Sequence, residues 1–306
     1  MASAPAKVIL FGEHAVVYGR PAIAVPVHSL HADVEATPSP AGAGVRIAAS
    51  DLGRTVDLRD APEDDPLALA ARLTLDALHA APPDVTLTIR SNIPVASNLG
   101  SGAAVSAALA RALAAALGAE LDDARLSALV YEVEKLHHGT PSGIDNTVVV
   151  YGQPVYFVRD QEPELFAIRR PFTLAIADTG IASPTRVAVG DVRALHARDP
   201  DFTTPRFDAI GAIAHTARFA IATRRVATLG PLMNQNHALL CELTVSCAEL
   251  DALVAAAREA GALGAKLSGG GRGGNMIALA EGVDRDRLKR ALCEAGAVRV
   301  IFTEVR

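Results

Sequence analysis

Two carboxylates stand eleven positions apart on either side of a turn rich in proline and glycine. Glu134 lies near the end of one expected helix, and Asp145 follows residues 139–143 at the start of the next. One carboxylate of such a pair can hold a metal ion while the other accepts a proton. The structural alternatives are a solvated Glu134 and an Asp145 that only caps its helix. His137 and His138 point in different directions on a helix, so we assign them no metal role.

A junction between a polar loop and an expected helix offers a second candidate site. It contains Asn98, Gly100, Ser101, Gly102 and Ala103. The first N–H groups of a helix are unpaired and carry the positive end of its dipole, and small residues let a phosphate approach them. The alternative is a helix capped by Ser or Asn, with glycines that serve only the turn.

The third candidate is the glycine loop, residues 269–274, in which five of six positions are glycine. Its members include Gly269, Gly270, Gly271 and Arg272. The GxGxxG pattern within it precedes an expected strand, whereas a dinucleotide fold requires a helix there. Such a run leaves backbone amides open to a ligand, and a flexible hairpin is the alternative.

Composition excludes several other classes. The chain has 306 residues, half of them hydrophobic, and a net charge of -5, so it folds and has no positive field for nucleic acid or an acidic membrane. Three cysteines without a CxxC pair favour a reducing, cytoplasmic setting. We find no signal peptide, membrane span, Walker A, HExxH or GxSxG pattern.

An α+β chain of two domains must position these segments. Apolar runs predict strands at 7–11, 22–27, 31–37, 45–49, 54–58, 85–89 and 154–158, and helical spacing predicts helices at 64–80, 101–117 and 122–138. Residues 159–171 are expected to connect the domains. After them we expect strands at 173–178, 264–268, 275–280 and 297–303 and helices at 185–198, 206–227, 231–242, 246–260 and 284–295.

Together with the N-terminus, these segments resemble the mevalonate kinases of the GHMP kinase superfamily. The resemblance runs through nearly the whole chain in the right order, and its first and third motifs are the most specific. The similar segments are 4–19 (APAKVILFGEHAVVYG), 93–104, 134–146 (ending in PSGIDN), 179–193, 233–237 and 266–275.

The resemblance implies a fold and an activity. It implies an N-terminal domain like that of ribosomal protein S5 over residues 1–165 and a C-terminal ferredoxin-like α+β domain over residues 166–306, with ATP and substrate in the cleft between them. The implied reaction is the ATP- and Mg²⁺-dependent phosphorylation of the 5-hydroxyl of mevalonate, in isoprenoid biosynthesis. A homodimer is expected by analogy alone.

The resemblance also implies catalytic roles. Asp145 corresponds to the catalytic base, and Lys7 to the lysine that interacts with this carboxylate and with the reacting hydroxyl. Glu134 corresponds to the magnesium ligand. Lys7 is one of only four lysines in the chain, and a nearby cation would keep Asp145 ionised. A lysine that flanks a strand by chance is the alternative.

Further residues correspond to binding positions, with two departures. Glu13, His14 and Thr185 correspond to the substrate side of the pocket, and Gly100, Ser101 and Gly102 to the triphosphate loop. The family loop usually reads GLGSSAA, and its second serine is a magnesium ligand; Gly102 offers no hydroxyl, so Ser101 or a water takes that position. Arg272 replaces a family glycine, and its guanidinium either contacts phosphate or faces solvent.

Other functions remain open at this stage. A phosphomevalonate kinase or an ATP-dependent mevalonate-type decarboxylase would use a similar cleft, but GEHAVVYG and the intact pair Glu134 and Asp145 favour a mevalonate kinase. A non-catalytic ligand sensor on the same fold would be expected to lose the base or the lysine, and neither is missing.

Overall fold

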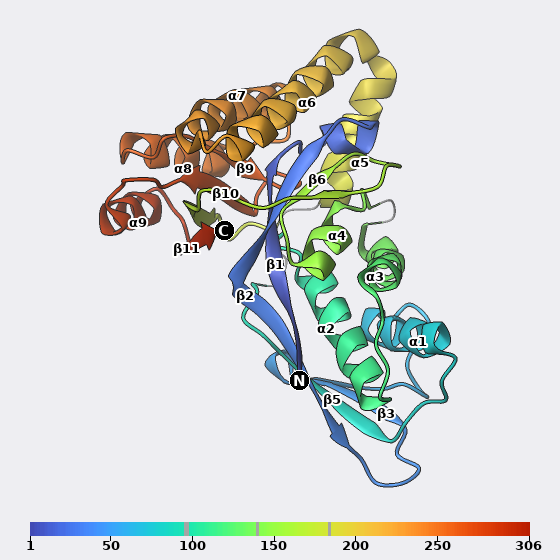
Figure 1. Cartoon of the computed structure of the whole chain (residues 1–306). Helices are drawn as coiled ribbons and strands as arrows, with labels where there is room; N and C mark the ends of the chain where they lie inside the picture. Colours follow the sequence, from blue (N-terminus) through green and yellow to red (C-terminus); the bar gives the residue numbers. More distant parts are fainter. Residues whose placement is uncertain (95–97, 139–140, 183–184) are drawn as a thin grey trace. The chain divides into compact units, whose positions relative to one another are not determined.

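The computed structural model describes residues 1–94, 98–138, 141–182 and 185–306, and its order of elements is the predicted α+β one (Figure 1). The chain divides into two compact units. Unit 1 consists of Met1–Ala6, His28–Pro94 and Gly100–Gly152, and unit 2 of Lys7–Val27, Val95–Leu99 and Gln153–Arg306. The resemblance predicted a boundary between the two family domains at residues 165 and 166, and this boundary stays a prediction.

The larger sheet of the described residues has the strand order β4-β3-β5-β2-β6-β7, and β1 pairs with β2. β3 runs parallel to β5, whereas β2 is antiparallel to both β5 and β6. The strands are β1 (Ala2–Phe11), β2 (Ala22–Pro38), β3 (Val45–Ala49), β4 (Arg54–Asp57), β5 (Val85–Ser91), β6 (Val155–Phe157) and β7 (Glu164–Leu165).

The strands expected separately at 22–27 and 31–37 form one continuous strand, β2. Its residues Ala22–Ala24 pair with β6, and its residues Ala32–Pro38 pair with β5. Hydrogen bonds to two different partners keep the whole segment extended, and a local hydrophobic pattern does not show them. The expected connection at 159–171 likewise contains a short strand, β7, because Glu164 and Leu165 pair with β6.

Four helices of unit 1 pack on one another: α1 (Pro66–Leu78), α2 (Ser101–Ala116), α3 (Asp123–His138) and α4 (Ile144–Tyr151). α1 begins where Asp65 caps it, since this carboxylate accepts from the N–H groups of Leu67 and Ala68. α2 contacts the other three helices and β5. Its alanines, of which Ala104 and Ala108 are fully buried, let these neighbours approach closely.

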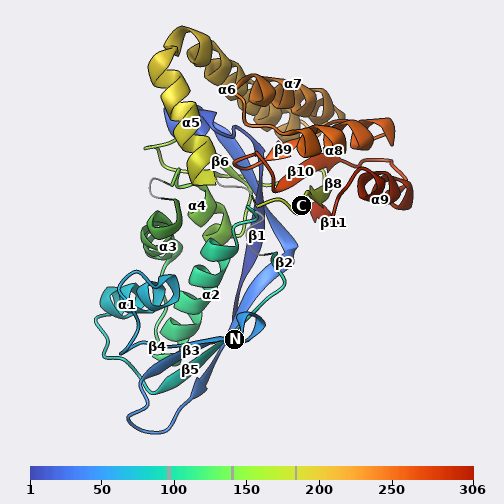
Figure 2. The same cartoon turned by 180° about the vertical axis from the view of Figure 1, so that it is seen from behind.

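Unit 2 contains an antiparallel sheet in the order β11-β8-β10-β9. Helices α7 and α8 lie over β9 and β10 in both views (Figures 1 and 2). Their shared core includes Phe207, Leu240, Leu253 and Leu267, all at most 1% exposed. The elements are β8 (Phe172–Asp178), β9 (Ala265–Ser268), β10 (Asn275–Leu279), β11 (Arg299–Val305), α5 (Thr185–Arg198), α6 (Pro200–Ala222), α7 (Leu229–Glu242), α8 (Ala248–Glu259) and α9 (Arg285–Glu294), with short 3-10 helices at Ala15–Tyr18 and Val226–Thr228 and another in unit 1 at Ser50–Leu52.

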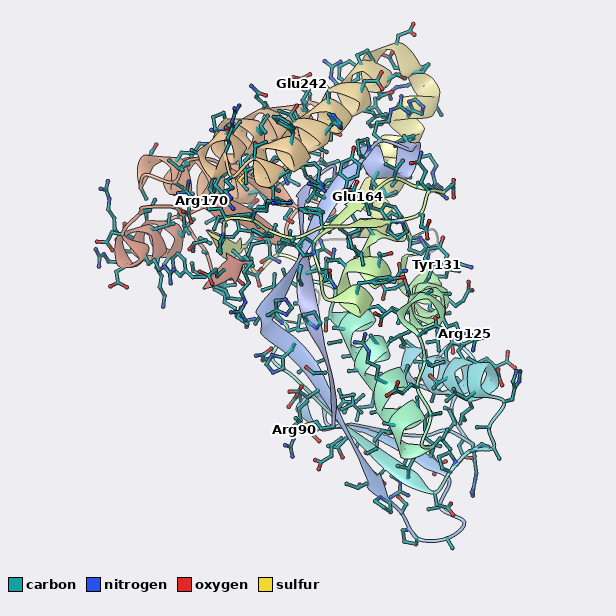
Figure 3. The ribbon with its side chains drawn as sticks, viewed as in Figure 1. Arg90, Arg125, Tyr131, Glu164, Arg170 and Glu242 are labelled. Carbon is teal, nitrogen blue, oxygen red and sulfur yellow. The ribbon has the colours of Figure 1, made fainter. Side chains whose placement is uncertain are left out.

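α6 differs from the predicted helix at both ends. It begins at Pro200 and not at 206, because Asp199 accepts from the N–H of Phe202 and proline suits the first helical position. It ends at Ala222, and Arg224 follows with a φ of 63°, a left-handed conformation that no helix continues through. Glu164, labelled in Figure 3, forms an ion pair with Arg218 of α6.

None of the helices in the described part of the chain combines the length and the apolarity that crossing a bilayer requires.

Candidate functional site

The predicted phosphate site lies at the start of α2, in unit 1. Its N-cap is Gly100, whose φ of 75° is in the left-handed region that glycine adopts without strain. Because the cap residue has no side chain, the expected alternative of a Ser or Asn cap is wrong. The first intrahelical bond runs from Ala104 N to Gly100 O at 2.9 Å, so the N–H groups of Ser101, Gly102 and Ala103 lie at the open end of the helix, where an anion binds.

The two predicted carboxylates lie on neighbouring helices of unit 1. Glu134 is on α3 and only 3% exposed, which excludes the solvated alternative. α4 begins after Gly143, its N-cap, and Asp145 lies in the first turn. Asp145 is therefore not the helix cap. The side chains of His137 and His138 lie outside the described residues, as do residues 139–140 of the turn.

Asn146 holds the start of α4 against α3. Its amide donates to Ser127 Oγ at 2.8 Å and to Ser127 O at 3.1 Å. Ser127 and Glu134 are seven residues apart, which is two helical turns, so they share a face of α3. These bonds hold the turn that carries Asp145 against the face that carries Glu134.

Lys7 is a buried residue of unit 2. It lies in β1, is 3% exposed, and its backbone N–H donates to Leu99 O at 2.9 Å. A lysine at a strand end by chance would be expected at the surface, because removing an ammonium group from water is costly. Burial therefore disfavours the chance alternative.

Glu13 forms a fully buried ion pair with Lys266 of β9. Lys266 Nζ also donates to Leu267 O at 2.6 Å. Burial raises the pKa of Glu13 and lowers the pKa of Lys266, and each charge opposes the shift of the other. The second carboxylate oxygen, Glu13 Oε2, is buried and has no hydrogen-bond partner among the described residues.

His14 is the buried neighbour of Glu13. Its Nε2 lies 3.1 Å from Gly270 O in the glycine loop. Burial lowers its pKa to about 4, so the ring is neutral near pH 7, and Nε2 must carry the proton because a carbonyl oxygen only accepts. His14 Nδ1 is then a buried acceptor, and within the described chain it has no partner.

Thr185 and Asn98 complete this part of unit 2. Thr185 Oγ1 donates to Asn98 Oδ1 at 2.9 Å, while Asn98 Nδ2 is buried and unpartnered among the residues that the structure describes. A Cβ on Gly270 would lie 2.8 Å from Thr185 Oγ1, and a Cβ on Gly269 would lie 3.1 Å from Asn98 Cβ. The loop thus packs directly on Thr185 and Asn98, and His14 binds it through Gly270 O.

The glycines of the loop are required by close backbone contacts. A Cβ on Gly271 would lie 1.9 Å from Val245 O, and a Cβ on Gly273 would lie 2.7 Å from Ile181 O. Both residues also have positive φ values, 75° and 127°. The loop is therefore packed against the protein backbone and is not a freely flexible hairpin.

The sequence left open whether Arg272 contacts phosphate or faces solvent. The structure shows protein partners for its partly exposed side chain, and a phosphate contact stays a prediction. Its guanidinium forms an ion pair with Asp191 of α5, and its Nε donates to Thr244 O at 3.2 Å. The backbone N–H of Arg272 donates to Val245 O at 2.8 Å. The side chain that replaces the family glycine thus joins the loop to its neighbours in unit 2.

The structure gathers the predicted residues within each unit. Unit 1 holds the start of α2 with Glu134 and Asp145. Unit 2 holds Lys7 and a set of neighbouring residues that we call the His14 group: Glu13, His14, Asn98, Thr185, Gly269 and Gly270. Three buried atoms of this group lack partners among the described residues: the acceptors Glu13 Oε2 and His14 Nδ1 and the donor Asn98 Nδ2. Such a set suits a ligand with hydroxyl groups, which donate and accept.

Sequence reasoning missed Lys266. It lies in the C-terminal motif and is one of four lysines, yet we expected no role for it. A lysine within an otherwise apolar strand, between Ala265 and Leu267, is the signal that could have indicated a buried ion pair.

The chain matches two family models of the GHMP kinases and is similar to known mevalonate kinases over most of its length. Residues 67–153 match the family described as GHMP kinases N terminal domain, and residues 217–298 match GHMP kinases C terminal. The chain is 37% identical over 300 residues to a mevalonate kinase of Thermococcus sibiricus (92% of this chain, 89% of the relative) and 36% identical over 325 residues to one of Pyrococcus furiosus (100% and 96%).

Two solved structures extend the likeness to the fold. The crystal structure of L. major mevalonate kinase in complex with R-mevalonate is similar with a TM-score of 0.86 and 31% identity, over 99% of this chain and 95% of that chain. The Methanococcus jannaschii mevalonate kinase is similar with a TM-score of 0.82 and 26% identity, over 99% and 96%.

Proposed function

The chain belongs to the GHMP kinases, within them to the mevalonate kinases, and from that premise we propose that it transfers the γ-phosphoryl group of ATP to the 5-hydroxyl of mevalonate. The His14 group supports this substrate most directly. Its unpartnered atoms Glu13 Oε2 and His14 Nδ1 accept hydrogen bonds, and Asn98 Nδ2 donates one. The hydroxyl groups of such a substrate can donate to the two acceptors and accept from Asn98 Nδ2.

Phosphoryl transfer asks a protein mainly to position the reactants and to neutralise charge. We assign the phosphates of ATP to the open N–H groups at the start of α2, from Ser101 to Ala103. Gly100 permits this use, because a cap without a side chain leaves the helix end accessible.

Magnesium is the metal that the family implies, and the residues present fit it. Glu134 offers a carboxylate and Ser101 a hydroxyl, both oxygen ligands, and they lie on the packed helices α3 and α2. When bound, the ion neutralises charge on the phosphate oxygens. Gly102 contributes no ligand side chain, so we assign the hydroxyl role to Ser101.

The remaining roles go to Asp145 and Lys7. In this proposal Asp145 accepts the proton of the attacking hydroxyl while the O–P bond forms, and the bond to the ADP oxygen breaks. Lys7 stabilises the negative charge that develops on the hydroxyl. Its burial supports an electrostatic role, because a charge in a poorly solvated position acts strongly on its neighbours.

One assay tests the activity. Purified protein is incubated with ATP and Mg²⁺ together with mevalonate, phosphomevalonate, homoserine or galactose, and mass spectrometry identifies the product. We expect phosphorylation of mevalonate alone. Phosphorylated phosphomevalonate, or release of CO2 coupled to ATP hydrolysis, would assign the chain to another branch of the superfamily. Mevalonate binding without turnover would identify a sensor.

Location and assembly are part of the proposal. Cys241, Cys247 and Cys293 are free thiols, which supports a reducing compartment such as the cytoplasm. A homodimer stays a prediction, and light scattering of the purified protein tests it.

A further inference from the structure

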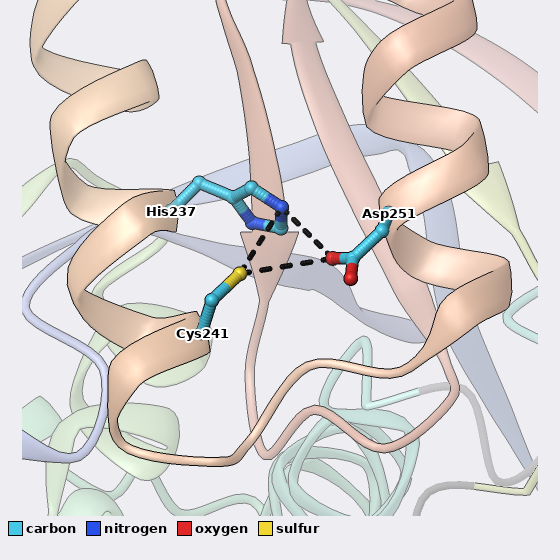
Figure 4. A group of neighbouring side chains, drawn as sticks. All are labelled: His237, Cys241 and Asp251. Atoms are coloured by element: carbon cyan, nitrogen blue, oxygen red, sulfur yellow. Dashed lines mark hydrogen bonds and ion pairs between the residues drawn. The ribbon is translucent and has the colours of Figure 1, made fainter.

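A second polar cluster lies in unit 2, next to the residues that bind the glycine loop. His237 and Cys241 of α7 face Asp251 of α8 (Figure 4). His237 Nε2 lies 3.2 Å and Cys241 Sγ 3.7 Å from the same oxygen, Asp251 Oδ1, and Ser246 Oγ donates to this oxygen at 2.5 Å. The ring of His237 is buried, whereas Asp251 is half exposed.

The cluster has the residue types of a metal site, but its hydrogen bonds favour another use. The backbone N–H of Leu267 donates to His237 Nδ1 at 3.3 Å, so Nδ1 holds a lone pair. A neutral imidazole then carries its proton on Nε2, and burial keeps the ring neutral by lowering its pKa to about 4. The Nε2 proton donates to Asp251, so a metal at Nε2 would have to displace this proton.

His237 connects the cluster to the strand that precedes the glycine loop. Leu267 is the third residue of β9, an edge strand whose outward N–H groups the sheet does not pair. α7 supplies the acceptors: His237 Nδ1 binds Leu267 N, and Asn234 Oδ1 binds Ala265 N at 3.0 Å. The orientation of the His237 ring therefore fixes the strand two residues before Gly269.

Ser246 connects the cluster to the middle of the glycine loop. Ser246 belongs to the connection between α7 and α8, and the two residues before it bind Arg272. Val245 O accepts from the N–H of Arg272, and Thr244 O accepts from its Nε. Because Ser246 Oγ and His237 Nε2 converge on Asp251 Oδ1, one carboxylate oxygen is linked to both sides of the segment Leu267–Arg272.

That segment carries Gly270 O, the acceptor that orients His14. We propose that Asp251 is a positioning residue for the kinase: through His237 and Ser246 it holds the glycine loop, and through Gly270 O it holds the His14 ring in the orientation that binds the substrate. The inference rests on the proposed function, but it predicts loop behaviour that is measurable without turnover.

Steady-state kinetics of Asp251→Ala test the link to substrate binding. Asp251 is half exposed, so its removal leaves no buried charge without a partner. We therefore expect the variant to fold. The KM for mevalonate should rise about tenfold while kcat changes less than about twofold. The substitution weakens substrate binding but leaves the reacting groups in place. Ser246→Ala removes one of the donors, and its KM should rise by about threefold.

Glu249→Ala is the matched control. Glu249 is an exposed carboxylate in the same first turn of α8, and the hydrogen bonds described above for His237 and Ser246 go to Asp251 and not to Glu249. Its kinetic constants should equal those of the unaltered protein. A KM for mevalonate unchanged in both Asp251→Ala and Ser246→Ala, or raised equally by Glu249→Ala, overturns the inference.

Hydrogen exchange separates this inference from the proposed function. In the unliganded protein, Asp251→Ala should speed amide exchange in residues 267–274, and Glu249→Ala should not. If the unaltered protein does not phosphorylate mevalonate, the proposed function fails, while this measurement still tests the network. Exchange unchanged in Asp251→Ala, or a Zn²⁺-dependent shift of the ¹⁵N signals of His237, overturns the network.

Discussion

Lys266 and Glu13 lie 253 positions apart in the sequence and form an ion pair in which neither side chain has any exposed surface. Breaking a buried pair from one side leaves an uncompensated charge, and this costs more than the intact pair contributes. The pair therefore makes the Glu13 carboxylate and the strand before the glycine loop depend on one another.

Lys266→Met tests this dependence. We expect a loss of about 3–5 kcal/mol in the free energy of unfolding. Without Lys266, burial raises the pKa of Glu13 with less opposition, so between the ordinary pKa of glutamate and the raised value the folded protein binds more protons than the unfolded chain. Its stability therefore falls as pH rises through that window, and denaturation at pH 5 and pH 7.5 should show the larger defect at pH 7.5. Lys289→Met, at an exposed position of α9, is the control and should change neither value.

His14 and His237, which are both buried, predict an acid-sensitive fold. His14 and His237 have pKa values lowered from 6.5 to about 4, chiefly by burial. Between these values the unfolded chain binds more protons, so stability is lost as pH falls from about 6.5 to 4, by up to about 3 kcal/mol for each group. His14→Asn should flatten this dependence in denaturant titrations, and His215→Asn, on the exposed face of α6, should not. An equal slope in both variants contradicts the assignment to His14.

Asp145→Asn tests the proposed base. Loss of the proton acceptor should lower kcat by about 10²–10⁴-fold, with unchanged thermal unfolding, since Asp145 is not the cap of α4. Asp123→Asn, an exposed carboxylate in the first turn of α3, is the control. Turnover within tenfold of the unaltered enzyme would show that another group takes the proton.

Glu134→Gln tests the proposed metal ligand. The Mg²⁺ concentration for half-maximal activity should rise at least about tenfold, because a neutral amide is a poorer ligand than a carboxylate. Glu132→Gln on the same helix removes an exposed carboxylate and serves as the matched control. If the two variants give the same magnesium titration as the unaltered protein, the ion is held by other residues.

Gly271→Ala tests the packing of the glycine loop. The new Cβ would lie 1.9 Å from Val245 O at a φ of 75°, so contact and backbone strain should together cost at least about 2 kcal/mol. Gly282→Ala has a similar φ of 70° with nothing within 4 Å. It isolates the backbone strain, and its unfolding temperature should fall less than that of Gly271→Ala.

Local patterns predicted most of the elements, and they indicated Glu134, Asp145, the start of α2 and the glycine loop as candidate sites. Lys7, Glu13, His14 and Thr185 were candidates only through the resemblance to mevalonate kinases. Small residues before an alanine-rich run indicated the open end of α2, and the Pro/Gly turn before Asp145 indicated the start of α4. What they could not show are partners far apart in the chain. Arg272 binds Asp191, 81 positions away, and β2 is continuous because β5 and β6 both pair with it. Such contacts depend on tertiary packing, which hydrophobic spacing does not encode.

The side chains of α7 that bind the outer N–H groups of β9 have one more consequence. An unprotected sheet border is a template on which a foreign strand can add, and this is a common route to aggregation. With Asn234 and His237 already bound to Ala265 and Leu267, an incoming chain finds these donors occupied. The substitutions that loosen the glycine loop from this side should therefore also make the protein more prone to self-association.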